Sequence, residues 1–221
     1  MADHTPRLAV LASGRGSNLQ AIIDAVADGR LDAHVAGVFG DRPKAFALER
    51  ARDAGIEARA LRPRDFADRD GFDAALFNEV ASVQPDFIVC AGYMRLLGAA
   101  ALEPWAGRII NIHPSLLPDF KGLDTHARAI AAGVAEHGAS VHFVTPDLDG
   151  GPVIAQARVP VLPGDDADTL AARVLETEHP LMLAVLQLLC AGRITLCDTV
   201  VELDGQPLPA PLQLASKRLP A

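Results

Sequence analysis

The feature that most constrains the fold of this chain is an alternation, over its first half, of short apolar β-rich runs with amphipathic helical runs. Such an alternation predicts a mostly parallel central sheet with helices on both faces. The expected strands cover residues 7–12, 34–39, 56–61, 86–91 and 108–113, and the expected helices cover 18–27, 44–54 and 70–83. The sequence therefore predicts an α/β fold.

The pattern changes after residue 125. A short helix ending at Gly133 precedes two β-rich runs, 139–145 and 153–161, which we expect to form an antiparallel pair in the C-terminal half. A long helix is expected over 168–191. Four prolines lie between Pro207 and Pro220, so the end of the chain is expected to be extended or loose.

Length and composition bound the kind of protein. A chain of 221 residues, half of them apolar, favours a single domain over 1–221, with a core at about 8–192 and a C-terminal extension at 193–221. The net charge of −8 argues against nucleic acid as a partner. The longest apolar stretch is too short to span a membrane, the first residues lack the long apolar core of a signal peptide, and the three cysteines lack metal-ligand spacing. We expect a cytoplasmic protein that is a monomer or homodimer.

A glycine-rich loop, residues 13–18, separates the first expected strand from the first expected helix. Glycines let the backbone approach an anion, and the helix N-terminus favours phosphate. Ser17 and Asn18 are expected to add side-chain donors and to cap the helix. Leu19 stands where the dinucleotide fingerprint has its third glycine, and Asp41 lies past the usual position of the ribose-binding acid. The loop therefore predicts a site for a monophosphate, the alternative being a tight turn that simply needs glycine.

A second motif, residues 111–118, ends the last strand of the alternating half. Side chains two apart on a strand share a face, so Asn111 and His113 point the same way. The carboxyl ends of strands in open α/β sheets are where ligands bind. Histidine can carry a proton near neutral pH, and an amide can donate to an oxyanion. This pair is a candidate for catalysis, the alternative being a core histidine beside an asparagine turn.

A third motif is the turn at 147–152, where two glycines follow Asp149. On its own it is typical of a surface hairpin. His142 shares a strand face with Ser140 and Val144, so a structural role is as plausible as a direct one. The remaining histidines of this half are isolated in sequence and lack metal-ligand spacing, so no metal site is expected; they are His126, His137 and His179.

Taken together, the stretches 14–19, 111–118 and 148–152 resemble the formyltransferase family, and the likeness runs from about Leu8 to Gly192. It includes 91–97, 140–144 and the pair Glu178 and His179. The resemblance implies a single Rossmann-like domain. It also implies transfer of a formyl group from 10-formyltetrahydrofolate, a cosubstrate, to the amine of glycinamide ribonucleotide in purine biosynthesis, without a metal.

The resemblance implies roles for particular residues of this chain. It assigns the catalytic roles to Asn111, His113 and Asp149. It assigns the binding of glycinamide ribonucleotide to Gly16, Ser17, Asn18 and Glu178. It assigns the binding of the formyl folate to Arg69, Met94, Arg95, Leu96, Leu97, Asn111, Thr145, Pro146, Asp147, Leu148 and Asp149.

These roles suggest a mechanism without a covalent intermediate, by direct transfer in a ternary complex. Attack of a neutral amine on the formyl carbon produces a tetrahedral oxyanion that Asn111 and a protonated His113 could stabilise. His113 could then deliver a proton to the leaving nitrogen. Asp149 is expected to raise the pKa of His113 and keep it charged.

Several alternatives stay open at this point. A methionyl-tRNA formyltransferase would need a further C-terminal domain and a basic surface. A formyltetrahydrofolate hydrolase would keep the catalytic trio but carry an N-terminal regulatory domain, for which the short segment before the first strand leaves no room. Sugar-nucleotide formyltransferases are more distant. A nucleotide-binding oxidoreductase or a non-catalytic phosphate sensor would use the glycine loop without the polar pair.

Overall fold

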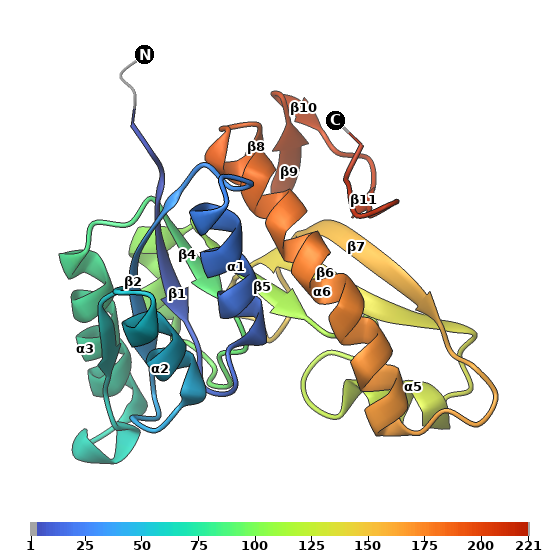
Figure 1. Cartoon of the computed structure of the whole chain (residues 1–221), viewed down its shortest axis with the longest axis horizontal. Coiled ribbons are helices and arrows are strands. Elements are labelled where there is room, and N and C mark those ends of the chain that lie inside the picture. Colours follow the sequence, from blue (N-terminus) through green and yellow to red (C-terminus); the bar gives the residue numbers. More distant parts are fainter. Residues whose placement is uncertain (1–3, 221) are drawn as a thin grey trace. The chain divides into compact units, whose positions relative to one another are not determined.

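The computed structural model describes residues 4–220, which divide into two compact units (Figure 1). The first unit runs up to Asn111 and the second begins at Ile112. Strand β5 (Ile109–His113) crosses this division. Each unit is described by itself below.

The first unit is built on a parallel sheet. Its strands lie in the order β5-β4-β1-β2-β3, and every neighbouring pair is parallel. The elements are β1 (Arg7–Leu11), α1 (Ser17–Ala27), β2 (His34–Gly40), α2 (Phe46–Asp53), β3 (Ala58–Ala60), a 3₁₀ turn η1 (Pro63–Asp65), α3 (Arg69–Ser82), β4 (Phe87–Cys90), α4 (Ala99–Leu102) and a 3₁₀ turn η2 (Glu103–Trp105). The predicted parallel sheet is confirmed, while the short helix α4 was not expected.

Helices cover both faces of this sheet, as two glycines of β2 show. A methyl group added at Gly40 would contact Leu48 of α2, whereas one added at Gly37 would contact Val83, at the end of α3. Residues three apart on a strand point to opposite faces, so α2 and α3 lie on opposite sides of β2 (Figure 1). The strands between them are buried on both faces, which is why they are apolar throughout rather than alternating.

The second unit packs one long helix on an antiparallel strand pair. Its elements before the C-terminal segment are α5 (Thr125–Ala131), β6 (Glu136–Phe143), β7 (Val153–Pro160) and α6 (Ala167–Cys190). Strands β6 and β7 pair antiparallel as predicted, and α6 crosses them (Figure 1). Helix α6 begins where Asp166 accepts a hydrogen bond from the N–H of Thr169. Its apolar stripe, including Leu181 and Val185, is buried.

The sequence did not predict the strands of residues 194–213. Strands β8 (Ile194–Cys197), β9 (Val200–Leu203) and β10 (Gln206–Pro207) form a three-stranded antiparallel sheet, and β11 (Leu212–Gln213) pairs parallel with β7. The prolines fit because none of them lies inside a central strand; Pro207 ends β10, at the edge of its sheet.

No helix among residues 4–220 is long and apolar enough to cross a membrane.

Candidate active site

The glycine loop lies between β1 and α1, as predicted, and its backbone is held in place by the neighbouring segments. The N–H of Ala47 donates to the carbonyl of Gly14 at 3.0 Å, and Nε of Arg50 donates to the carbonyl of Arg15 at 2.9 Å. The helix starts at Ser17, and Gly16 is its N-cap residue with no side-chain cap. The expectation that Ser17 and Asn18 cap the helix is therefore wrong, because both already lie inside its first turn. That first turn leaves backbone N–H groups without intrahelical acceptors, which suits an anion.

The structure requires glycine at position 16 of this loop but not at position 14. Gly16 has φ +74°, and an added Cβ would lie 2.7 Å from both Cα and Cβ of Ala47. Gly14 has nothing within 4 Å of such a Cβ. We expect Gly16→Ala to lower the free energy of unfolding by roughly 1–3 kcal/mol, since a left-handed non-glycine residue costs that much before any clash. Gly14→Ala is the matched control, and urea unfolding measures both; equal stability of the two variants would contradict the packing argument.

The segment predicted to contact the folate follows β4 and lies beside the glycine loop. The N–H of Ser13 donates to the carbonyl of Gly92 at 3.1 Å, and the N–H of Met94 donates to Oγ of Ser13 at 3.0 Å. Met94 and Leu96 are exposed by 63% and 46%, whereas Leu97 is buried. An exposed apolar pair at the carboxyl end of a strand is suited to an apolar ring of a ligand.

Two arginines predicted on the folate side have protein partners in this unit. The guanidinium of Arg95 lies 5.1 Å from the ring centroid of Phe72, and Nε of Arg69 lies 4.0 Å from Oδ2 of Asp73. Burial raises the pKa of Asp73, although the N–H of Gly98 donates to it at 2.7 Å. Arg69 is the first residue of α3 and its side chain is half exposed.

In the second unit, the structure brings His113 and Asp149 together. Nδ1 of His113 lies 3.4 Å from Oδ2 of Asp149, and both side chains are nearly buried. The N–H of Gly122 donates to the same carboxylate oxygen at 2.9 Å. Nε2 of His113 lies 3.1 Å from the carbonyl oxygen of Phe120. The turn at 147–152, which on its own is typical of a surface hairpin, therefore places the carboxylate of Asp149 against the buried imidazole of His113.

The electrostatics of His113 differ from the expectation. Burial lowers its pKa, and the nearby His142 and Arg128 lower it further, while the carbonyl of Phe120 and the charge of Asp149 raise it. The net pKa lies below its ordinary value, so the prediction that Asp149 keeps His113 charged is wrong. Desolvation of the imidazolium outweighs one partly buried carboxylate. His113 is mainly neutral at neutral pH.

Asp149 is held as a carboxylate. Burial alone would raise its pKa, but the contact with His142, the N–H of Gly122 and the proximity of His113 together hold the pKa below its usual value. Its backbone has φ +44°, a left-handed conformation that aspartate tolerates better than most residues. The site therefore pairs an ionised acid with a neutral base.

The strand β5 carries Asn111 and His113 two residues apart, so their side chains share a face by strand alternation, while Ile110 and Ile112 are buried on the other face. The chain after β5 is fixed by a buried network. Oγ of Ser140 donates to the carbonyl of Ser115 at 2.7 Å, and the N–H of Leu117 donates to Oγ of Ser140 at 3.0 Å. This network fixes the path that leads to the carbonyl of Phe120.

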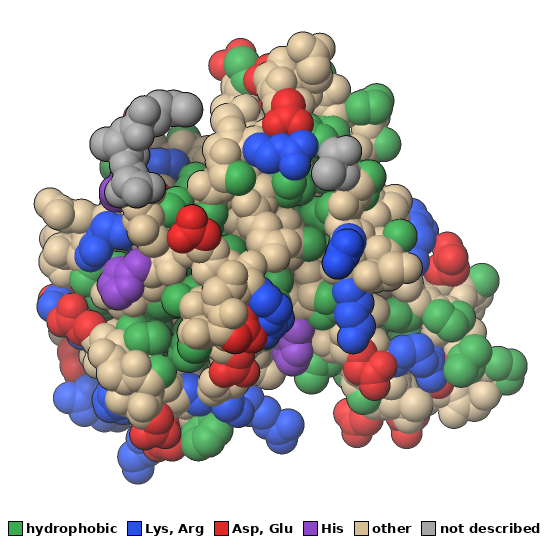
Figure 2. Space-filling model, turned by 45° about the horizontal axis from the view of Figure 1, so that its top comes forward, with side chains coloured by type: hydrophobic (Ala, Val, Ile, Leu, Met, Phe, Trp, Pro, Cys, Tyr) green, Lys and Arg blue, Asp and Glu red, His purple; other side chains and the backbone are tan. Residues whose placement is uncertain are grey.

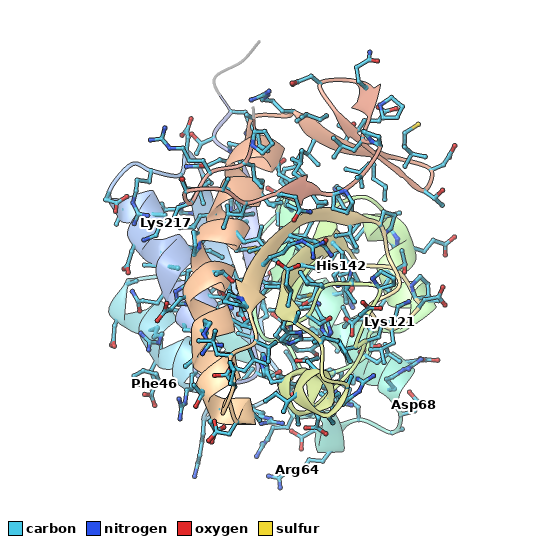
Figure 3. All side chains as sticks on the ribbon, turned by 90° about the vertical axis from the view of Figure 1, so that its right-hand side faces the viewer. Phe46, Arg64, Asp68, Lys121, His142 and Lys217 are labelled. Atoms are coloured by element: carbon cyan, nitrogen blue, oxygen red, sulfur yellow. The ribbon has the colours of Figure 1, made fainter. Side chains whose placement is uncertain are left out.

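His142 is a site residue that the sequence left undecided. Its Nε2 lies 3.7 Å from Oδ1 of Asp149, and its Nδ1 lies 2.8 Å from the carbonyl of Phe143 (Figure 3). The pairing register of β6 with β7 shifts between Val141 and His142. Strand alternation alone could not predict where His142 points, because such an irregularity changes the direction of side chains beside it. The carbonyl of Phe120 and the N–H of Gly122 carried no sequence signal at all.

His126 and His137, which are isolated from each other in sequence, lie close together in the fold, with their ring centroids 5.2 Å apart. The ring of Phe120 lies 5.8 Å from that of His137. No group of three or more His, Cys, Asp or Glu side chains that could hold a metal ion occurs within residues 4–220.

His137 gives a pH-dependent stability. Burial, and next the charge of His126, lower its pKa from 6.5 to about 4. A lowered pKa means that the unfolded chain binds the proton first, so stability is full above pH 6.5 and is lost as pH falls towards 4. At about 1.4 kcal/mol per pKa unit, we expect this residue to account for roughly 3 kcal/mol of that loss. Urea unfolding of His137→Phe at pH 7 and pH 4.5 measures it, with His34→Asn as an exposed control; an unchanged pH dependence in His137→Phe would refute the assignment.

Glu178 lies in the middle of α6 and is half-buried. It is followed by His179 and by Pro180, which lies inside the helix. Proline cannot donate to the carbonyl four residues back, so the helix has a gap in its hydrogen bonding at Glu176. Of the loop predicted to contact the folate, Thr145 and Asp149 are partly buried, while Pro146, Asp147 and Leu148 are exposed.

Comparison with known proteins defines the class. Residues 6–186 match the family described as formyl transferase. The chain therefore belongs to the formyl transferase family, as the resemblance predicted.

Particular relatives narrow the class further. The chain is 48% identical to the phosphoribosylglycinamide formyltransferase of Escherichia coli, over 91% of this chain and 95% of that protein. Among solved structures, the phosphoribosylglycinamide formyltransferase of Coxiella burnetii is similar with a TM-score of 0.89 and 45% identity, covering 93% of this chain and 96% of the other. A formyltetrahydrofolate deformylase from Pseudomonas syringae is similar with a TM-score of 0.84 and 25% identity, covering 91% of this chain and 66% of the other.

Proposed function

We propose that this protein is an enzyme of purine biosynthesis that transfers the formyl group of 10-formyltetrahydrofolate to the amine of glycinamide ribonucleotide. The products are formylglycinamide ribonucleotide and tetrahydrofolate. Membership of the formyl transferase family and the relatives named phosphoribosylglycinamide formyltransferase support this choice of reaction. The observation that carries the chemistry is the buried imidazole of His113, whose Nδ1 faces the carboxylate of Asp149 at 3.4 Å.

In the proposed reaction the amine nitrogen attacks the formyl carbon, and the carbonyl oxygen becomes an oxyanion. Asn111 donates a hydrogen bond to this oxyanion. The neutral imidazole of His113 takes the proton that the attacking nitrogen loses. The bond between the formyl carbon and N10 of the folate then breaks, and His113 returns the proton to N10. Asp149 stabilises the imidazolium that exists between the two proton transfers.

The substrates are assigned to separate sets of residues in this proposal. Gly16, Ser17 and Asn18 bind the phosphate of glycinamide ribonucleotide at the first turn of α1, and Glu178 binds near its amine end. The exposed apolar side chains of Met94 and Leu96 support binding of the folate ring system. The other residues proposed to contact the folate are Arg69, Arg95, Leu97, Asn111, Thr145, Pro146, Asp147, Leu148 and Asp149.

We further propose one formyltransferase domain over 1–221, with its core at about 8–192 and an extension at 193–221. The family match supports it because that match runs across the division between the two units. The proposal includes a cytoplasmic location, a monomer or homodimer, small-molecule substrates without nucleic acid or membrane, and catalysis without a metal.

The test is an assay of tetrahydrofolate formation with purified protein, 10-formyltetrahydrofolate and glycinamide ribonucleotide. We expect turnover only when both substrates are present. In the Ser17→Ala variant we expect KM for glycinamide ribonucleotide to rise by about tenfold, the size of one hydrogen bond to a charged group, with kcat little changed. The formyl group recovered on glycinamide ribonucleotide identifies the acceptor.

Hydrolysis of the formyl folate is the second candidate, favoured by the likeness to a formyltetrahydrofolate deformylase. Water would replace the amine in the same step, and formate would be the product. Tetrahydrofolate formed at the same rate without glycinamide ribonucleotide would establish the hydrolase and refute the transferase.

A further inference from the structure

The loop of residues 120–124 touches both members of the pair His113 and Asp149. The carbonyl oxygen of Phe120 lies 3.1 Å from Nε2 of His113. The N–H of Gly122 donates to Oδ2 of Asp149 at 2.9 Å. Both contacts are made by backbone groups, so they depend on the path of the loop rather than on its side chains. Whatever holds this path therefore controls the surroundings of the histidine and the aspartate.

The contact with Phe120 fixes which nitrogen of a neutral His113 carries the proton. A carbonyl oxygen can only accept a hydrogen bond, so Nε2 carries the hydrogen and donates it. The lone pair of the neutral imidazole is then on Nδ1, which lies 3.4 Å from Oδ2 of Asp149. This distance is longer than the ~2.7–2.9 Å of a charge-assisted hydrogen bond, as expected where no proton is shared. In the proposed reaction Nδ1 is therefore the atom that takes the proton from the amine.

The loop has a backbone conformation that most of its residues do not favour. Phe120 and Asp124 have φ of +53° and +56°, in the left-handed region. For a bulky residue such as Phe120 this conformation is a genuine outlier, and it persists only where the surrounding structure holds it. Gly122, with φ +80°, adopts it without a steric cost. The loop therefore needs contacts from outside its own backbone.

Arg128, on helix α5, supplies such contacts. Its Nη1 donates to the carbonyl of Lys121 at 2.6 Å and to the carbonyl of Leu123 at 3.2 Å. These two carbonyls flank Gly122, whose N–H binds the aspartate. The guanidinium also lies 5.7 Å from the ring centroid of Phe120, within reach of a cation–π interaction. One side chain thus contacts the loop at three of its five residues.

These contacts set Arg128 apart from other arginines of the protein. Several exposed arginines pair with a carboxylate, for example Arg30 with Asp28. Figure 2 shows Lys and Arg side chains beside Asp and Glu side chains over much of the face in view. In the part of the chain that the structure describes, Arg128 makes no ion pair and donates to backbone carbonyls instead. Its charge is therefore used to fix a segment of backbone.

We propose that Arg128 is a positioning residue for the transfer reaction, holding the loop 120–124 so that its backbone fixes the tautomer of His113. The inference rests on the proposed function and adds a residue to it. Arg128 contacts neither substrate and no reacting atom. Its loss therefore affects kcat more than KM, because the base is misplaced while the binding residues are unchanged.

The first experiment measures formyl-transfer kinetics of Arg128→Met, which loses the charge and the donors but keeps a long side chain and a good helix former in α5. We expect kcat to fall about tenfold, the size of a hydrogen bond to a charged group, with KM for both substrates changed by less than about twofold. An unchanged kcat, or a rise in KM alone, would overturn the proposal.

Arg108→Met is the matched control. Arg108 is exposed, its Nη2 donates to the carbonyl of Pro104 at 2.8 Å, and its guanidinium lies 4.5 Å from the ring centroid of Trp105. It therefore makes the same two kinds of contact as Arg128, but in the first unit. We expect Arg108→Met to keep the kcat of the starting enzyme.

A double-mutant cycle tests whether Arg128 acts through the imidazole. In the His113→Asn background, Arg128→Met is expected to change the residual kcat by less than about twofold, because the tautomer that it controls no longer exists. A tenfold loss in both backgrounds would show that Arg128 acts elsewhere and would refute the positioning role.

The positive charge of Arg128 has a separate effect, which the pH profile distinguishes. Burial lowers the pKa of His113, and His142 and Arg128 lower it further, while the Phe120 carbonyl and Asp149 raise it. Loss of the charge alone would move the acid limb of kcat to higher pH and leave the plateau above it unchanged. Loss of positioning lowers the plateau itself. A plateau equal to that of the starting enzyme would reduce Arg128 to a charge effect and contradict the proposal.

Nitrogen NMR of histidine-labelled protein reads the tautomer without substrates. At a pH where His113 is neutral, we expect a protonated Nε2 and an unprotonated Nδ1, assigned by the signals lost in His113→Asn. Arg128→Met is expected to give a mixture of tautomers and Arg108→Met the starting one. A proton on Nδ1 in the starting protein, or an unchanged tautomer in Arg128→Met, would refute the inference. If thermal melting shows that Arg128→Met is unfolded, Arg128→Ala replaces it with the same expected results. Because this readout needs no turnover, failure here and failure of the proposed reaction are distinguishable.

Discussion

Replacing His113 with asparagine is expected to lower kcat for formyl transfer by about 10²- to 10⁴-fold, the usual contribution of a positioned acid–base group. Asparagine retains a polar side chain at this buried position but cannot carry a proton between the attacking amine and N10. KM for either substrate is expected to change by far less, because the imidazole acts in the transition state rather than in binding. Initial rates of tetrahydrofolate formation at saturating substrates give the result.

The control for this variant is His34→Asn, an exposed histidine of β2, which is expected to retain full activity. Thermal melting separates catalysis from folding, since His113 is 6% exposed and its loss also disturbs packing. A folded His113→Asn enzyme with an unchanged kcat would remove His113 from the mechanism.

Asp149→Asn is expected to lower kcat by about 10²- to 10⁴-fold, as for other enzymes in which a carboxylate supports a catalytic histidine. The amide keeps the size of the side chain but removes the charge that stabilises the imidazolium. Asp149→Asn is also expected to shift the pH profile of kcat/KM in a definite direction. The pKa of His113 is already below its ordinary value, and Asp149 is one of the two groups that raise it.

In the starting enzyme, activity that needs a neutral His113 is present above its pKa and is lost as pH falls through it. Removing the negative charge lowers that pKa further, so the acid limb of log kcat/KM against pH moves to lower pH in Asp149→Asn. Asp198→Asn is the control, because Asp198 is exposed and also has a positive φ, +53° against +44°. An acid limb that moves to higher pH, or does not move, would contradict the role given to Asp149.

How far the sequence predicts this site depends on the range of the interactions involved. The glycine loop and the pair Asn111 and His113 are local features, recognisable because a strand precedes each of them and its end is where ligands bind. Gly16 illustrates the limit. Its presence signals a tight turn, but its close approach to Ala47 involves a helix thirty residues further on and has no local sequence signal.

The pKa of His113 is likewise set by tertiary contacts that the sequence does not reveal. A carboxylate partner suggested a raised pKa, and the resemblance supplied that partner. The sign of the shift depends on how deeply the imidazole is buried and on the proximity of His142 and Arg128. These are sums over neighbours from several elements, and no one motif contains them.

The sequence by itself determined the alternation of strands and helices, the antiparallel pair β6 and β7, the family, and which polar residues end the strands. It could do so because hydrophobic periodicity and turn chemistry act over a few residues. Only the tertiary structure decided the ordered C-terminal strands, the approach of Asp149 and His142 to His113, and the pairing of His126 with His137. Each of these depends on contacts between segments distant in the chain, and burial and charge act through space rather than along the sequence.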